Sequence, residues 1–333
     1  MDRDPVSVKR SRRWMALRIL AYLLFFAVVL PGAVCARWIF MPVLPLEQDP
    51  GDFGLSFLPV SFTTADGIEI KGWFIPPEQA QSPRSRPLVV LLHGLGANRS
   101  QMLPYAALAA KEGYPSLLFD FRAHGQSGGS RTTIGWDERQ DLAAALDFAR
   151  EKLARRTFIL WGVSMGAATA ALTAPGRDDI HAMILESPYD TLRNTIRHHA
   201  SLYFHLPQVV YEPLEVAWFQ WLSGVKVDAV SPRDSLARMD AGVPLLLVGS
   251  QEDERMPPSL VESVARAANA QLRRVWISDT GPHAGIMYVN PEQYRMQVRR
   301  FLDDAGDFIR RARPGEIPAI TPGLPAPAER HAP

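Results

Sequence analysis

The sequence predicts an α/β protein with a mostly parallel, doubly wound sheet, an antiparallel hairpin ahead of that sheet, and a small helical cap. Three observations carry the prediction: a hairpin pattern around residue 66, short apolar runs that alternate with helical stretches, and a bulky insertion between two of those runs. The chain has 333 residues, of which 47% are hydrophobic. That composition is ample for the core of one large domain.

The hairpin prediction comes from two alternating segments on either side of Asp66-Gly67. Residues 60–63 and 68–71 each alternate apolar and polar side chains. An Asp-Gly pair between two such segments is a strong signal for a tight antiparallel connection. The alternation also indicates that one face of the hairpin meets water.

The strands of the main sheet are predicted from continuous apolar runs, which are typical of strands buried on both faces. These runs cover residues 88–92, 116–119, 158–161, 182–185 and 245–248. Helical stretches separate or follow them, at residues 101–111, 138–152, 167–174, 259–268 and 291–302. Alternation of strand and helix predicts a parallel sheet covered on both faces.

The N-terminus carries a basic segment, residues 1–18, followed by an apolar run over residues 19–36. Eighteen helical residues rise about 27 Å, close to the roughly 30 Å hydrocarbon core of a bilayer. We therefore expect a single-pass membrane anchor. The positive-inside rule then places the rest of the chain on the non-cytoplasmic side, which in a bacterium is the periplasmic face of the inner membrane. A cleaved signal peptide, giving an exported soluble protein, is the alternative.

The remaining chain divides by composition. Residues 37–57 are expected to form a stem and residues 58–312 the folded domain. Residues 190–240 are too long for an ordinary connection and rich in aromatic side chains, so we expect a helical cap there. The Pro- and Ala-rich tail, residues 313–333, is expected to be disordered.

A nucleophile motif occupies Gly162-Val163-Ser164-Met165-Gly166, between the apolar run 158–161 and a helical stretch of small residues. This strand–turn–helix setting is the one that a nucleophile elbow requires. The first turn of the helix offers free N–H groups and the positive end of the helix dipole. Ser164 is the predicted nucleophile, and the N–H of Met165 is a predicted oxyanion donor.

The other site residues follow from chain order. The glycine-rich loop 93–98 ends an earlier strand and is expected to donate the second oxyanion hydrogen bond, from the N–H of Leu95. The acid and the base should follow the serine. Asp253 lies just after the strand at 243–248, and Glu252 and Glu254 compete with it. His283 follows the strand at 274–277 and is the predicted base.

Charge and cysteine content exclude several other functions. The net charge is +1, so no basic field points to nucleic acid. Cys35 is the only cysteine, which rules out an internal disulfide and a CxxC metal site. We expect no metal and no organic cofactor, and the sequence does not indicate an oligomeric state.

These residues carry a family resemblance. From about residue 60 to residue 302 the chain resembles the α/β-hydrolase superfamily, especially its serine-aminopeptidase-like and monoacylglycerol-lipase-like serine hydrolases, including membrane-anchored members. Residues 120–127 are similar to that group's Asp-x-Arg-Gly-His-Gly-x-Ser signature, with Ala123 in place of a glycine. We expect this segment to be a structured turn near the site. The acid loop departs from the usual His-Gly start, which leaves its register open between Asp253 and Glu252.

The resemblance implies acyl transfer. His283 would take the proton of Ser164, and the serine would attack a carbonyl carbon. The expected function is hydrolysis of a carboxylic ester with an acyl or lipid-like substrate. One alternative is a serine aminopeptidase, which would use a cap carboxylate such as Glu212 or Glu215 to hold a substrate ammonium. Another is a non-catalytic scaffold or receptor, because fold does not imply function.

Overall fold

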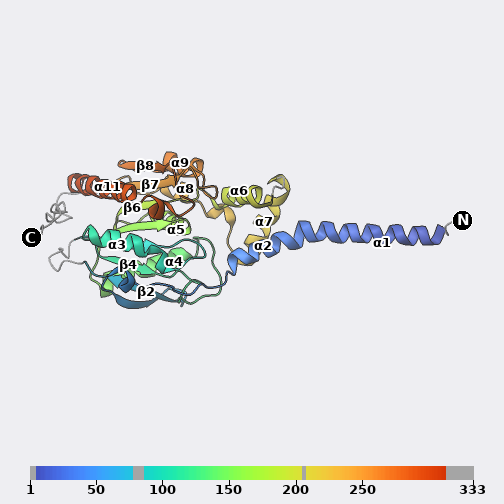
Figure 1. The fold of residues 1–333 in the computed structure, drawn as a ribbon, viewed down its shortest axis with the longest axis horizontal. Helices are drawn as coiled ribbons and strands as arrows, with labels where there is room; N and C mark the ends of the chain where they lie inside the picture. Colours follow the sequence, from blue (N-terminus) through green and yellow to red (C-terminus); the bar gives the residue numbers. More distant parts are fainter. Residues whose placement is uncertain (1–4, 78–85, 205–207, 313–333) are drawn as a thin grey trace, which may run out of the picture.

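The computed structural model describes residues 5–77, 86–204 and 208–312. In this part of the chain a single eight-stranded sheet runs in the order β1-β2-β4-β3-β5-β6-β7-β8 (Figure 1). The strands are β1 (Leu58–Thr63), β2 (Glu69–Ile75), β3 (Leu88–Leu92), β4 (Ser116–Phe119), β5 (Phe158–Val163), β6 (Ile180–Glu186), β7 (Leu245–Ser250) and β8 (Arg273–Ser278). The β1–β2 and β2–β4 pairs are antiparallel and the others are parallel.

The sheet confirms the predicted fold class. Strands β3 to β7 are buried along their whole length, as their continuous apolar runs predict. The β1–β2 hairpin pairs Thr63 with Glu69, and Gly67 lies in its turn with φ +84°, a conformation that favours glycine. Because the parallel strands share one direction, their carboxyl ends meet at one edge, where the functional loops gather.

Helices cover both faces of the sheet. Successive residues of β3 show this, since Val90 belongs to one apolar cluster with α4 (Glu138–Lys152), α5 (Met165–Thr173) and α9 (Pro258–Ala267). Leu91 faces the other cluster, with α3 (Leu103–Lys111) and α11 (Pro291–Ala312). The last helix runs ten residues beyond the predicted 291–302. Its apolar stripe continues through the buried Ala305 and Ile309.

The cap lies between β6 and β7. It consists of α6 (Leu192–Phe204) and α7 (Gln208–Ser223), followed by the short helices η4 (Val227–Ala229) and α8 (Pro232–Leu236). Three further short helices are η2 (Pro50–Phe53), η3 (Arg99–Met102) and α10 (Ile286–Val289). The predicted disordered tail, residues 313–333, and the first four residues of the basic segment lie outside the described residues.

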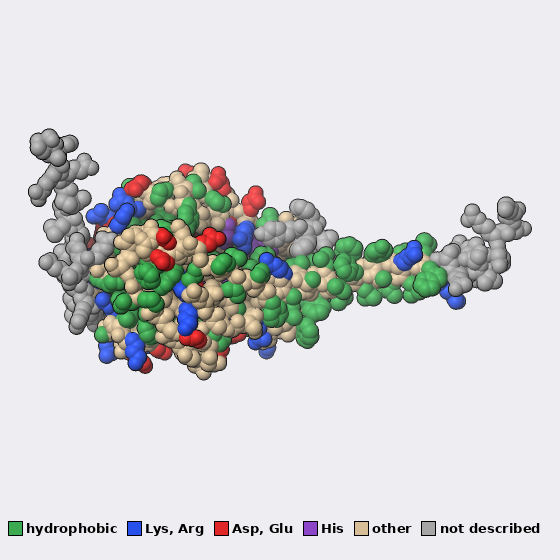
Figure 2. Space-filling view, turned by 60° about the horizontal axis from the view of Figure 1, so that its bottom comes forward, with side chains coloured by type: hydrophobic (Ala, Val, Ile, Leu, Met, Phe, Trp, Pro, Cys, Tyr) green, Lys and Arg blue, Asp and Glu red, His purple; other side chains and the backbone are tan. Residues whose placement is uncertain are grey.

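The N-terminal segment differs from its prediction. It forms α1 (Pro5–Leu24), a π-helical turn η1 (Phe25–Val29) and α2 (Leu30–Ile39). Helix α1 projects from the body, and apolar side chains cover much of the projection (Figures 1 and 2). Over the described chain, no helix combines the length and the apolar character needed to cross a membrane. The transmembrane helix predicted for residues 19–36 is therefore not supported.

The second half of that apolar run packs against protein. Cys35 and Ile39 of α2 are buried. A Cβ added at Gly32 would lie 2.7 Å from the ring of Trp218, so α2 and α7 approach closely at this glycine. The helix also continues to Ile39, three residues into the predicted stem. This half of the run is therefore packed against the cap, whereas apolar side chains of the first half, such as Ile19, Leu20 and Phe26, are exposed.

Candidate active site

Ser164 occupies a sharp turn between β5 and α5. Its φ is +53° and its ψ is −114°, in the region that non-glycine residues rarely adopt. Such a conformation costs about 1–3 kcal/mol and persists only where the surroundings enforce it. Here the Ser164 N–H donates to the carbonyl of Glu186 at 2.9 Å. A Cβ added at Gly162 would lie 2.4 Å from the backbone carbonyl carbon of Gly166, and a Cβ added at Gly166 would lie 2.2 Å from the carbonyl oxygen of Leu92. The turn therefore requires both glycines.

Three predicted residues from distant segments meet at this turn. His283, which follows β8, places Nε2 2.9 Å from Ser164 Oγ and Nδ1 2.8 Å from Asp253 Oδ2. Asp253 is only 1% exposed, and its Oδ1 accepts the N–H groups of Arg255 and Met256 at 3.1 and 2.8 Å. The result is a continuous hydrogen-bonded chain from acid to imidazole to hydroxyl.

The electrostatics of Asp253 suit the role of an acid that stays ionised. Burial acts to raise its pKa, but the hydrogen bond from His283 and the electrostatic interaction with that imidazole act in the opposite direction. Together with the backbone N–H of Met256 they hold the pKa of Asp253 below its usual value.

The competing loop carboxylates point elsewhere. Glu252 is exposed, and its Oε2 accepts the N–H of Gly281 at 2.8 Å. Glu254 is exposed as well. Of the three carboxylates considered in this loop, the structure therefore aims that of Asp253 at the imidazole of His283.

The two predicted oxyanion donors lie beside Ser164. Leu95 and Met165 line the same pocket as the serine, and neither of their N–H groups donates to another protein group in the described chain. The loop is held on both sides of Leu95. The Gly94 N–H donates to Gln101 Oε1 at 2.8 Å, and the Gly96 N–H donates to His124 Nε2 at 3.2 Å. Two fixed and unused donors are the arrangement that a developing oxyanion needs.

His93 and His124 support this loop rather than react. Both are buried, and His93 Nε2 accepts the N–H of Phe121 at 3.0 Å. Its Nδ1 lies 2.8 Å from the carbonyl of Gly94, so Nδ1 carries the proton. Burial lowers the pKa of both imidazoles, which keeps the rings neutral.

The segment over residues 120–127 is a turn that braces the same loop. The buried Asp120 carboxylate accepts the N–H of Arg99 and that of Gln126, each at 2.7 Å, and it pairs with the Arg99 guanidinium at 2.7 Å. Ala123 has φ +57°, which explains why a glycine is usual at this position of the signature. A Cβ at Gly125 would lie 2.1 Å from Asp120 Oδ2. The segment is a turn close to the site, as expected.

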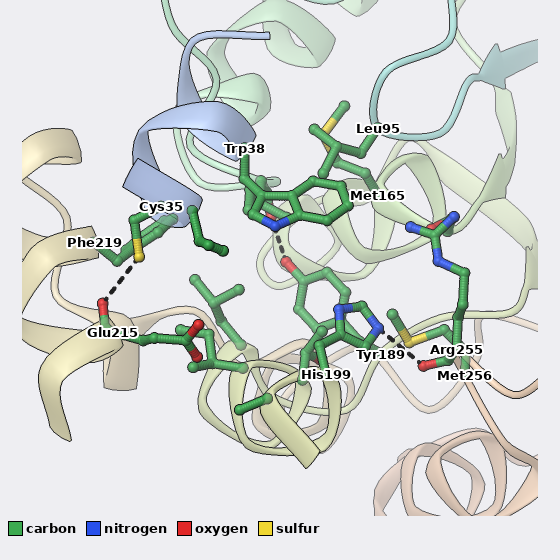
Figure 3. Close-up of a pocket in the computed structure, with 17 residues that line it drawn as sticks. Cys35, Trp38, Leu95, Met165, Tyr189, His199, Glu215, Phe219, Arg255 and Met256 are labelled. Carbon is green, nitrogen blue, oxygen red and sulfur yellow. Dashed lines mark hydrogen bonds between the residues drawn. The ribbon is translucent and has the colours of Figure 1, made fainter. Parts of the chain in front are cut away.

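Ser164 opens into a cavity of about 80 Å³ whose walls come from three parts of the chain. Leu95 and Met165 belong to the main domain, His199 and Phe219 to the cap, and α2 completes the enclosure (Figure 3). The lining is mainly apolar. Within the described chain no group of three His, Cys, Asp or Glu side chains could hold a metal ion.

The cap carries one carboxylate in this cavity. Glu215 is 6% exposed, lines the pocket, and its carboxylate makes no hydrogen bond in the part of the chain that the structure describes. Burial raises its pKa to about 7. Glu212 instead binds Arg193 at 2.8 Å and Arg197 at 2.6 Å. Of these two candidates from the sequence, only Glu215 lines the cavity.

Nothing in the sequence indicated that Val34, Cys35 or Trp38 would lie in the site, yet all three line the cavity. The one sequence feature that is compatible with packing against the protein is Pro31-Gly32 inside the apolar run. A glycine there permits close packing against another helix, but it equally suits a signal peptide or a kinked anchor.

Comparison with known proteins agrees with the fold. Residues 83–235 match a family described as serine aminopeptidase, S33. The match contains Leu95 and Ser164 and ends before Asp253. Among curated relatives, the uncharacterised protein YqkD of Bacillus subtilis is 28% identical over 247 residues, covering 73% of this chain and 78% of that protein. Protein bem46 of Schizosaccharomyces pombe is 24% identical and covers 63% and 64%.

Comparison with solved structures also agrees with the fold. The Pyrococcus furiosus esterase Pf2001 superposes with a TM-score of 0.64 at 26% identity, covering 79% of this chain and 98% of that one. An esterase from Exiguobacterium antarcticum, at 18% identity and a TM-score of 0.54, shares the fold over 74% of this chain and 100% of that one. The sheet, the family match and the Pyrococcus furiosus esterase together support placing the chain in the α/β-hydrolase superfamily, as a hydrolase.

Proposed function

We propose that the protein is a serine hydrolase that cleaves a carboxylic ester through an acyl-enzyme at Ser164. One observation carries the proposal: His283 lies within hydrogen-bond distance of both Ser164 and the buried Asp253, at 2.9 and 2.8 Å. This is the geometry in which an imidazole can take the proton of a hydroxyl nucleophile. The unused N–H groups of Leu95 and Met165 beside the hydroxyl add to the argument.

The chemistry follows from these positions. Ser164 Oγ attacks the ester carbonyl carbon while His283 Nε2 takes the hydroxyl proton, and the N–H groups of Leu95 and Met165 stabilise the negative oxygen. The proton then passes from His283 to the leaving alcohol, and the acyl group stays on Ser164. Water deacylates the serine by the same steps, with His283 again as the base. Asp253 holds the proton on Nδ1 throughout and stabilises the charged ring.

The cavity favours an ester with an aliphatic acyl chain. Its walls are mainly apolar side chains, among them Val34, Ile196 and Phe219. We therefore propose a linear aliphatic acyl chain, and the esterase of Pyrococcus furiosus among the structural relatives is consistent with ester hydrolysis.

A serine aminopeptidase is the second candidate, and Glu215 is the observation that favours it. A buried carboxylate with no internal partner in the described chain could pair with the ammonium of a substrate amino terminus. The family match points the same way. The apolar character of the remaining lining is the reason to rank the ester first.

A fluorophosphonate probe tests the proposal without knowledge of the substrate. Wild type and a Ser259→Ala variant, which changes an exposed serine, should be labelled, whereas Ser164→Ala should not. Turnover of p-nitrophenyl hexanoate should fall by about 10⁶ in Ser164→Ala. Absence of labelling in wild type would instead support a non-catalytic scaffold, and labelling that survives Ser164→Ala would reject this nucleophile.

Glu215→Gln separates the two enzymatic candidates. An esterase should keep hexanoate hydrolysis close to the wild-type rate, because the amide fills the same space. An aminopeptidase should hydrolyse aminoacyl p-nitroanilides, and Glu215→Gln should raise their KM because the charge that holds the ammonium is lost.

A further inference from the structure

We propose that the N-terminal segment over residues 31–45 is a working part of the active site. In this proposal α2 forms the wall of the acyl pocket that selects chain length, and the segment after it braces the oxyanion loop. The inference rests on the proposed esterase function and adds specificity-determining residues that lie outside the hydrolase domain predicted from the sequence, which begins at residue 58.

Three contacts fix α2 in place. Gly32 allows the Trp218 ring of α7 to approach, since any Cβ at Gly32 would overlap it. The Cys35 thiol donates to the backbone carbonyl of Glu215, with Sγ 3.4 Å from the oxygen. At the end of the helix, the carbonyl of the fully buried Ile39 accepts the N–H of Thr132 at 3.0 Å. The helix is thus held by the cap at one end and by the main domain at the other.

The face of α2 between these contacts forms a wall of the cavity. Val34, Cys35 and Trp38 line the same space as Ser164 (Figure 3). They lie one and three to four residues apart, the spacing that puts them on one side of a helix. Ala33 and Arg37 are exposed on the other side. An acyl chain bound to Ser164 therefore meets the cap and α2 as one continuous apolar surface.

The segment after α2 contacts the loop that carries Leu95. Asn98 Nδ2 donates to the carbonyls of Leu44 and Pro45, at 3.3 and 2.9 Å. Gly96 has φ +74°, and a Cβ there would lie 2.6 Å from Met41 Cε, so the Met41 side chain packs directly on the loop. The same segment that shapes the pocket therefore also supports one oxyanion donor.

Cleavage near residue 36 would remove Val34 and Cys35 from the wall. It would leave Trp38 without the helix that carries it. The active species should therefore retain α2, whatever else happens to the N-terminus. Intact-mass measurement of the protein after labelling at Ser164 reads this directly, and a labelled species that begins near Arg37 would overturn the proposal.

The main experiment narrows and widens the wall in the full-length protein. Val34→Phe should fill part of the pocket, and Val34→Ala should enlarge it. Ala33→Phe, on the exposed side of the same turn, is the matched control. The readout is the rate at which Ser164 is labelled by p-nitrophenyl alkylphosphonates from ethyl to octyl. Far-ultraviolet circular dichroism and a thermal melt establish that each variant is folded.

Each buried methylene strengthens binding about fourfold. If the new ring excludes two methylenes of the octyl chain from the pocket, the rate at which the octylphosphonate labels Val34→Phe should fall by more than about tenfold. The ethyl rate should stay within about twofold, because the chemistry at Ser164 is unchanged. Val34→Ala should shift the optimum to longer chains, and Ala33→Phe should match wild type.

Each result points to a distinct conclusion. If wild type is labelled but Val34→Phe and Val34→Ala show the same dependence of labelling rate on chain length as wild type, the wall proposal is wrong and the proposed hydrolase stands. If both Val34 variants melt like wild type and the Ala33→Phe control shifts the profile equally, the effect does not come from the pocket face, and the proposal also fails. If wild type itself is not labelled by any phosphonate, the proposed function is what fails.

Discussion

Replacement of Asp253 by asparagine tests the acid with a neighbouring residue as its control. Asp253 Oδ1 accepts two backbone N–H groups, from Arg255 and Met256, and an asparagine oxygen can keep both. The asparagine NH2 then faces Nδ1 of His283, where the Asp253 carboxylate oxygen lay at 2.8 Å. An NH2 group can only donate, so it forces Nδ1 to act as an acceptor.

The consequence is the wrong tautomer of the base. With Nδ1 accepting, the ring proton moves to Nε2 and points at Ser164 Oγ, 2.9 Å away. The imidazole can no longer take the serine proton. We expect turnover of p-nitrophenyl hexanoate to fall by about 10⁴, which corresponds to roughly 5 kcal/mol of transition-state stabilisation.

The control is Glu252→Gln. Its side-chain oxygen can still accept the Gly281 N–H, so turnover should stay within about threefold of wild type. Both variants should melt within a few degrees of wild type, because each keeps its backbone hydrogen bonds. The opposite ranking, with Glu252→Gln inactive and Asp253→Asn active, would refute the reasoning and move the acid by one residue.

Three further changes test how the site is supported. Ala123→Gly should raise the free energy of unfolding by up to about 1 kcal/mol in urea titrations, because φ +57° disfavours a side chain. Gly166→Ala should abolish probe labelling, since its Cβ would lie 2.2 Å from the Leu92 carbonyl. The pKa of Glu186 is raised to about 7 by burial, against hydrogen bonds from two tyrosines. The folded chain then holds a proton that the unfolded chain releases above about pH 4.5, so stability declines as pH rises from about 4.5 through 7. Glu186→Gln should remove up to roughly 3 kcal/mol of that decline, read as the difference in urea titrations between pH 5 and 8.

Local patterns in the sequence determined the sheet and the elbow. Each strand buried on both faces leaves a continuous apolar run, and the turn at Ser164 demands Gly162 and Gly166 because of backbone contacts within a few residues or with one neighbouring strand. The order of Ser164, Asp253 and His283 along the chain also predicted three residues that the structure brings within hydrogen-bond distance.

The choice between adjacent carboxylates needed the tertiary structure. Glu252 and Asp253 occupy a loop with no periodicity, so nothing in the local sequence says which one faces His283 and which one faces Gly281. The same is true of Glu212 and Glu215 in the cap. They lie three residues apart on α7, and only the positions of Arg193 and Arg197 show that Glu212 has partners.

The N-terminal segment shows most clearly the difference between what the local sequence indicates and what the tertiary structure decides. Its apolar residues predicted a membrane anchor, whereas the structure buries Cys35 and Ile39 against protein and leaves Ile19, Leu20 and Phe26 exposed. Hydrophobic burial is non-directional, so a run of apolar side chains gains about as much from lipid as from a protein surface. What selects the protein surface is shape, namely the gap at Gly32 that receives Trp218 and the bond from Cys35 to the Glu215 carbonyl. Those partners lie about 180 residues away along the chain, so only the folded structure could place α2 in the pocket.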